Sequence, residues 1–138
     1  MAATGRREAV LAYITCASDV EAERIGRALD AERLAACVNI LPGMRSLYWW
    51  QGALTASEEA VLIAKTTAVG APALTARVLE LHSYSCPCVV VVPLIGGNPA
   101  YLDWLAGEVR QLAPGAAAPG VSASPARPAP PTGAPPPG

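Results

Sequence analysis

The stretch CVNILPGMRSLYWW at residues 37–50, followed by QG at 51–52 and EAVLIAKT at 59–66, determines the fold. Both arms are rich in β-branched and aromatic residues, which favour strands, and the QG pair is typical of a turn. Pro42-Gly43 interrupts the first arm. Because proline has no amide hydrogen to donate, we expect an edge strand or a bulge at that point. The stretch therefore predicts a long antiparallel hairpin.

A strand and a helix precede this hairpin. Residues 10–16 alternate in the manner of a buried strand. The segment SDVEAERIGRALDAERLAA follows, in which Ser18 and Glu21 have the spacing of a capping box. This pattern predicts a helix with its apolar stripe directed inward. The expected stripe consists of Val20, Ile25, Ala28, Leu29 and Leu34.

A helix, a strand and a terminal helix follow the hairpin. We expect a helix over residues 71–82, with Gly70 as its cap and Pro72 in its first turn. Residues 89–94 are apolar throughout, which is typical of a buried strand. Asn98-Pro99 then predicts the start of the last helix.

The order strand-helix-strand-strand-helix-strand, with a C-terminal helix, predicts an α+β fold of the ferredoxin-like, split βαβ type. Such a fold has an antiparallel sheet with helices on one face. The other face and the extended hairpin would expose Tyr48, Trp49 and Trp50 near the tip. Exposed aromatic residues indicate either a self-assembly interface or a ligand platform. Assembly is favoured, because the free edge of the hairpin can extend a neighbour's sheet.

Composition divides the chain into one domain at residues 8–112, a flexible N-terminus at 1–7 and a tail at 113–138. The tail holds nine of the 14 prolines and only one charged residue, Arg127. It is therefore expected to be disordered, although its PxxP-like spacings would also suit a docking segment. The net charge of −1 gives no basic patch for nucleic acid. No apolar run approaches the ~20 residues needed to cross a bilayer, so no membrane association is expected.

The N-terminal residues indicate where in the cell the protein is located. Arg6-Arg7 and the apolar run after them resemble a short secretory signal, but Glu8 opens that run and its alternation favours a strand. We therefore expect a cytoplasmic protein whose four cysteines are reduced thiols.

The segment HSYSCPC, residues 82–88, brings the single histidine close to two thiols. Thiolates and imidazole suit copper, as Cu(I) or Cu(II), or Zn(II), so His82, Cys86 and Cys88 are a candidate metal site. An extended chain would place Cys86 and Cys88 on the same side, with their Cα atoms ~6.5–7 Å apart. The structural alternative is a helix end followed by a core strand, with both cysteines packed as small apolar side chains.

Other chemistry is less well supported. Cys86 or Cys88 could imitate a nucleophile, with His82 as its base and Asp103 as the group that orients the base. Nothing in the sequence brings these residues together, so we expect no enzyme activity. There is no Gly-rich phosphate loop after a strand, so no organic cofactor is expected. Lys65 shares a strand face with apolar residues and should need a partner, either Glu59 or a bound anion.

Four blocks in order resemble the CutA divalent-cation tolerance proteins: AACVNILPGMRSLYWWQG, EAVLIAKT, the HxYxxP of residues 82–87, and GNPAYLDWL. The resemblance runs from about Val10 to Arg110. It implies a ferredoxin-like subunit in a homotrimer similar in architecture to the PII signalling proteins, with hairpins that wrap around neighbouring subunits. It also implies a link to tolerance of copper and other divalent metals, and so a metal-binding protein that responds to metal ions.

The resemblance further implies a cleft between subunits, to which Lys65, Trp50, His82 and Tyr84 would contribute. A small-molecule-sensing or scaffolding trimer built around that cleft is the alternative function. The family commonly has His-Pro-Tyr-Glu-x-Pro-Glu where this chain has HSYSCPC. Both acidic positions have therefore lost their carboxylates and two thiols have appeared, so a hard-oxygen metal site does not carry over.

Overall fold

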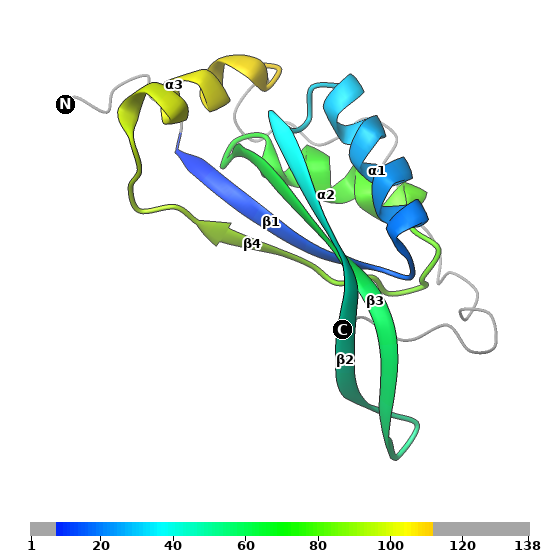
Figure 1. Ribbon diagram of the computed structural model, residues 1–138. Coiled ribbons are helices and arrows are strands. Elements are labelled where there is room, and N and C mark those ends of the chain that lie inside the picture. The colour runs from blue at the N-terminus through cyan, green and yellow to red at the C-terminus, as the bar shows by residue number, and fades with distance from the viewer. Residues whose placement is uncertain (1–7, 112–138) are drawn as a thin grey trace.

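The computed structural model describes residues 8–111, so the expected flexible N-terminus and proline-rich tail lie outside the described residues. The elements are β1 (Ala9–Cys16), α1 (Asp19–Ala31), β2 (Cys37–Trp50), β3 (Ala53–Thr67), α2 (Ala71–Leu81), β4 (Val89–Pro93) and α3 (Pro99–Glu108). The strands form one antiparallel sheet in the order β2-β3-β1-β4 (Figure 1). The predicted α+β class and the predicted order of elements are confirmed.

Helices α1 and α2 cover one face of the sheet, and the main core lies between them and β1 and β3 (Figure 1). Alternation along the strands places every second side chain in this core. Its largest members are Ile14, Ile25, Leu29, Leu62, Leu74 and Val78. Leu105 of α3 and Val109, the C-cap of that helix, form a second, smaller cluster with Ala9.

The β2–β3 hairpin extends well beyond the helices (Figure 1). It turns at Gln51 and Gly52, which both have positive φ, 51° and 80°. These angles match the tight turn that joins twisted antiparallel strands. The register shifts between Leu41 and Met44, so the predicted irregularity at Pro42-Gly43 is a bulge, and β2 is also an edge strand as predicted. Strand β3 begins at Ala53, earlier than the sequence indicates.

Helix α1 begins as predicted. Ser18 is its N-cap, and the Ser18 hydroxyl accepts a hydrogen bond from the Glu21 amide at 3.1 Å. The expectation that Val20 belongs to the buried stripe was wrong, because Val20 is 74% exposed. Ala22 and Ile25 define the inward face, and a residue two positions before Ala22 lies about 200° around the helix from it.

The prediction of a buried strand at residues 89–94 was also wrong for the single chain. Val90, Val91 and Val92 are 50%, 41% and 44% exposed. The reason is topological. Within residues 8–111, β4 is an edge strand that pairs with β1 alone, and Val89 is its one residue that packs against the main core.

Helix α2 has Gly70 as its N-cap and Pro72 in its first turn, as predicted, and His82 is its C-cap. Asn98 is the N-cap of α3. No helix within residues 8–111 is long and apolar enough to cross a membrane.

Candidate functional site

His82 lies directly after α2 with its ring turned into the protein. Nε2 is 2.7 Å from the Thr15 carbonyl oxygen, and Nδ1 accepts a hydrogen bond from the Tyr84 amide at 3.1 Å. Because the Tyr84 amide must donate, the ring carries its proton on Nε2 and donates it to Thr15. Both nitrogens are therefore occupied by backbone groups, and the residue is only 3% exposed.

Glu21 joins the start of α1 to the segment after α2. Its carboxylate accepts hydrogen bonds from the Ala17 amide at 2.9 Å and the Ser83 amide at 2.7 Å, and one oxygen lies 3.8 Å from His82 Nδ1. Burial acts to raise the pKa of Glu21, but these hydrogen bonds outweigh it and the pKa is lowered. The predicted capping box is thus modified: Ala17, not Ser18, donates the return hydrogen bond.

Cys16, Glu21 and His82 together form a buried cluster whose ligand atoms lie within 4.8 Å of one another, and no other group of this kind occurs in residues 8–111. Burial, reinforced by nearby carboxylates, raises the pKa of the Cys16 thiol to about 12. A metal ion here would have to remove that proton and break the backbone hydrogen bonds of His82 and Glu21. We therefore interpret the cluster as structural.

Tyr84 and Glu59 form a second buried polar pair. The Tyr84 hydroxyl donates to Glu59 Oε2 at 2.7 Å, and the residues are 1% and 2% exposed. Burial, followed by the bond to Glu59, raises the pKa of Tyr84. The other carboxylate oxygen, Glu59 Oε1, has no hydrogen-bond partner among the described residues. In the single chain the Tyr84 hydroxyl is therefore already engaged.

The predicted metal residues His82, Cys86 and Cys88 are not brought together as a group of three in this structure. Cys86 is exposed and Cys88 is partly exposed, whereas the His82 ring is buried. The physical reason is that backbone partners hold the imidazole inside, next to Cys16, which belongs to the helix-covered core.

Lys65 has a different partner from the one expected. Its Nζ lies 5.6 Å from the centre of the Tyr101 ring, a cation–π contact with α3. The predicted pairing with Glu59 was wrong, because Glu59 is six residues away on β3 and binds Tyr84. Trp50 pairs with Ala53 at the hairpin turn, ~40 Å from Lys65 along the strand. A cleft containing Trp50 and Lys65 therefore needs a second chain.

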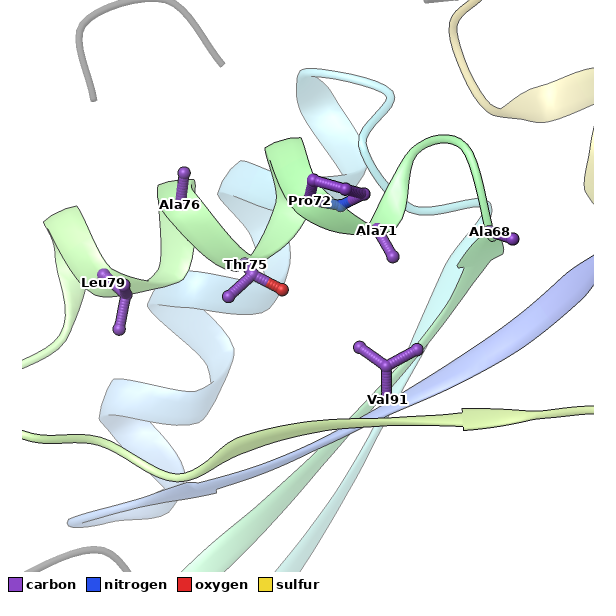
Figure 2. A pocket seen from close by; sticks show the side chains of 7 residues that line it. All are labelled: Ala68, Ala71, Pro72, Thr75, Ala76, Leu79 and Val91. Carbon is purple, nitrogen blue, oxygen red and sulfur yellow. The ribbon is translucent and has the colours of Figure 1, made fainter. Parts of the chain in front are cut away.

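An apolar groove of about 470 Å³ lies between α2 and β4, and Figure 2 shows Val91 pointing from the strand toward the helix. Thr75 supplies the only side-chain polar atom. The groove contains no titratable residue and none of the predicted site residues. Its lining consists of Ala68, Ala71, Pro72, Thr75, Ala76, Leu79 and Val91.

Sequence reasoning missed the polar residues that surround the predicted ones. Glu21 was assigned only a capping role and Glu59 only a pairing with Lys65. Thr15 was not identified as a candidate site residue, although its buried hydroxyl has no hydrogen-bond partner among the described residues. The available signal was the presence of polar residues at buried strand and helix positions, since such groups need partners.

Comparison with known proteins adds a consistent result. The family model for the CutA1 divalent ion tolerance protein matches residues 10–108. The chain is 49% identical over 92 residues to the "Divalent-cation tolerance protein CutA" of Thermus thermophilus, covering 67% of this chain and 89% of that protein. It is 39% identical over 102 residues to the chloroplastic CutA 1 protein of Oryza sativa, covering 74% of this chain but only 58% of that relative.

Solved structures agree with the sequence matches. The crystal structure of CutA1 from Oryza sativa superposes with a TM-score of 0.76 at 37% identity, covering 78% of this chain and 98% of that one. The Thermus thermophilus protein gives a TM-score of 0.72 at 44% identity, covering 74% and 99%. A structure from Archaeoglobus fulgidus, described as a periplasmic divalent cation tolerance protein, gives 0.71 at 38% identity, covering 74% and 99%.

Proposed function

Because the chain belongs to the CutA1 divalent ion tolerance family, we propose that it binds copper or another soft or divalent cation and takes part in the response to metal ions. The family match carries this proposal, since it spans nearly all of the described residues. The proposed role is one of binding, without catalysis and without an organic cofactor. The proposed location is the cytoplasm, where the thiols stay reduced.

The proposed binding segment is residues 82–88, where the sequence predicts His82, Cys86 and Cys88. Thiolates are soft ligands, which suit Cu(I) and Zn(II) better than Mg²⁺ or Ca²⁺. This chemistry depends on the two cysteines.

The proposed assembly is a homotrimer of ferredoxin-like subunits, similar in architecture to the PII proteins. Exposed apolar side chains on the projecting hairpin support it: Leu47, Trp49 and Leu54 are 69%, 72% and 65% exposed. Trp49 pairs directly with Leu54 across the hairpin, so these side chains form a continuous patch. Apolar patches of this kind mark interaction surfaces.

A small-molecule-sensing or scaffolding trimer is the second candidate function, and one observation favours it. Lys65 is half-buried, and its Nζ lies over the Tyr101 ring. An ammonium group in this setting would suit an anionic ligand at a subunit boundary. Trp50 from a neighbouring hairpin could complete such a cleft. Tyr84 would first have to release Glu59.

Native mass spectrometry of the reduced protein, titrated without oxygen with Cu(I) and separately with Zn(II), tests the metal proposal and the assembly together. We expect a trimer that takes up three ions. A trimer that binds neither metal would overturn the metal-binding function and favour the sensing alternative. A monomer would overturn the assembly.

A further inference from the structure

We propose that the proline- and alanine-rich tail of this chain docks through residues 114–121 on the apolar groove between α2 and β4. The inference takes up the docking role that the sequence leaves open for the tail. It goes beyond the proposed metal-binding function and does not depend on it. It names an occupant for the groove, a segment of the same chain.

The groove exposes apolar side chains over its whole length. Figure 2 shows its residues in a row along one side of α2, from Ala68 at one end to Leu79 at the other, with Val91 facing them from β4. Leu79 and Val91 are 39% and 41% exposed. Because Val91 points toward the helix, its neighbours Val90 and Val92 point to the opposite face of β4 and lie outside this surface. Covering the groove would remove the apolar area of Leu79 and Val91 from water, which is favourable.

The described chain ends beside one end of the groove. A methyl group on Gly70 would lie 3.3 Å from Val109 Cγ1. The groove residues Ala68 and Ala71 lie within two positions of Gly70 in the sequence. Val109 is held in place by packing, since it is only 2% exposed. The tail that follows residue 111 therefore starts close to the Ala68 end of the groove.

The tail is long enough to lie along the groove. Ala71 and Leu79 both belong to α2, and the rise of a helix places them ~12 Å apart along its axis. Proline-rich segments favour the polyproline II helix, which advances ~3.1 Å per residue. Residues 114–121 would therefore span ~25 Å, enough to approach the Ala68 end and pass along the groove. This length places Val121 near the Leu79 end.

The composition of the segment matches that of the groove. Residues 114–121 read PGAAAPGV, and no charged side chain occurs between residues 112 and 126. The groove contains no titratable residue, and Thr75 supplies its only side-chain polar atom. Alanine and proline lose almost no side-chain entropy when they are buried, so they suit a shallow apolar surface. Val121 is the first large apolar side chain after Leu112 and is therefore the expected anchor.

Attachment to the same chain allows a weak contact to be occupied. A short flexible tether gives an effective concentration in the ~mM range. A contact with a Kd of ~0.1 mM would then be formed about nine-tenths of the time. The groove volume of about 470 Å³ is that of a site for a small ligand, which suits a few extended residues better than a folded partner.

Photo-crosslinking in the full-length protein tests the proposal. Benzoylphenylalanine is introduced either at position 121, inside the proposed docking segment, or at position 134, beyond it. After irradiation, mass spectrometry of the digested protein identifies the joined peptides. Mixing isotope-labelled with unlabelled chains before irradiation separates links within one chain from links between chains. We expect position 121 to link within its own chain to residues 68–79 or to Val91, and position 134 not to do so.

A second measurement uses smaller changes to the same segment. Val121→Asp places a charge in the proposed contact, and the matched control Ala134→Asp places the same charge outside it. Methyl NMR of the full-length protein reports on Leu79 and Val91. Their resonances should shift from the wild-type positions in Val121→Asp and stay at those positions in Ala134→Asp. The methyl resonances of Ile14, in the main core, check that each variant is folded.

Two results would overturn the proposal. Links from position 121 to the groove of another chain would make the groove an assembly contact. Equal linking from positions 121 and 134, or resonances of Leu79 and Val91 that do not move in Val121→Asp, would show that the tail does not occupy the groove. A protein that binds no metal would leave both measurements unchanged, so failure of the proposed function is distinguishable from failure of this inference.

Discussion

At the scale of single residues, buried polar groups fix the region where β1 ends. His82 and Glu21 together bond to the backbone of Thr15, Ala17, Ser83 and Tyr84. These contacts join the start of α1 to the segment after α2. They satisfy groups that would otherwise be costly to bury. The HxY motif therefore has a structural role independent of any metal.

Cys16 makes the stability of the fold sensitive to alkaline pH. Its thiol has a pKa of about 12 in the folded chain against an ordinary value of 9.0. Above pH 9 the unfolded chain loses this proton and the folded chain keeps it, so the free energy of unfolding falls as pH rises. Between pH 8 and pH 10 the expected loss is about 1 kcal/mol. Tyr84, whose pKa is also raised, begins to contribute only above its ordinary value of 10.0.

Urea denaturation of wild type and Cys16→Ala at pH 8, 9 and 10 measures this effect. At pH 8 the variant is expected to have a lower free energy of unfolding than the wild type, because the substitution leaves a small cavity. Between pH 8 and pH 10 its free energy of unfolding should fall less than that of the wild type. Parallel declines in the two proteins would show that Cys16 is not the titrating group.

The chemistry-bearing residues could be identified from the sequence, but the direction of their side chains could not. His82, Cys86 and Cys88 lie within seven positions, and this proximity suggests one site. What turns the imidazole inward is the Thr15 carbonyl, 67 residues away, and Glu21 lies 62 residues from the Ser83 amide that it binds. Only the tertiary structure brings these groups together.

At the scale of elements, caps and turns were predictable because their causes are local. Ser18, Gly70 and Asn98 each stand where a helix begins, as their sequence context indicates. The bulge at Pro42-Gly43 follows from the missing amide of proline. The exposure of side chains was harder to predict, because it depends on which elements pack beside a strand. The sequence of β4 is as apolar as that of a central strand, yet β4 lies at the edge of the sheet.

Two glycines offer a matched test of the hairpin turn. A methyl group on either Gly52 or Gly107 would meet nothing within 4 Å, so only the backbone distinguishes them. Gly52 has a φ of 80°, where an L side chain costs roughly 1–2 kcal/mol, while Gly107 lies within α3. We expect Gly52→Ala to lower the free energy of unfolding by about 1 kcal/mol and Gly107→Ala to raise it by about 0.5 kcal/mol. Urea denaturation measures both, and changes of the same sign would contradict this account.

At the scale of the whole molecule, residues 8–111 expose apolar surface on the hairpin and on β4. The tip of the β2–β3 hairpin lies clear of the helices (Figure 1). The edge strand β4 carries the exposed side chains of Val90, Val91 and Val92. Among the described strands, β2 and β4 are the outer ones, and each pairs on one side. Unpaired edges with apolar side chains favour association with further chains. The proposed trimer would account for all of these features together.

The assembly can be tested on two exposed side chains with nearly equal accessibility. Trp49, on the hairpin, is 72% exposed, and Val20, on α1, is 74% exposed. Neither contributes to the core, so Trp49→Asp and Val20→Asp should both leave the chain folded. If the hairpin patch is an interface, Trp49→Asp removes an aromatic anchor worth ~2 kcal/mol or more, and the concentration needed for assembly rises at least ~30-fold. Val20→Asp should assemble like the wild type. Light scattering during size-exclusion chromatography over a dilution series compares the masses, and an intact trimer in Trp49→Asp at every concentration would show that the hairpin tip is not the contact surface.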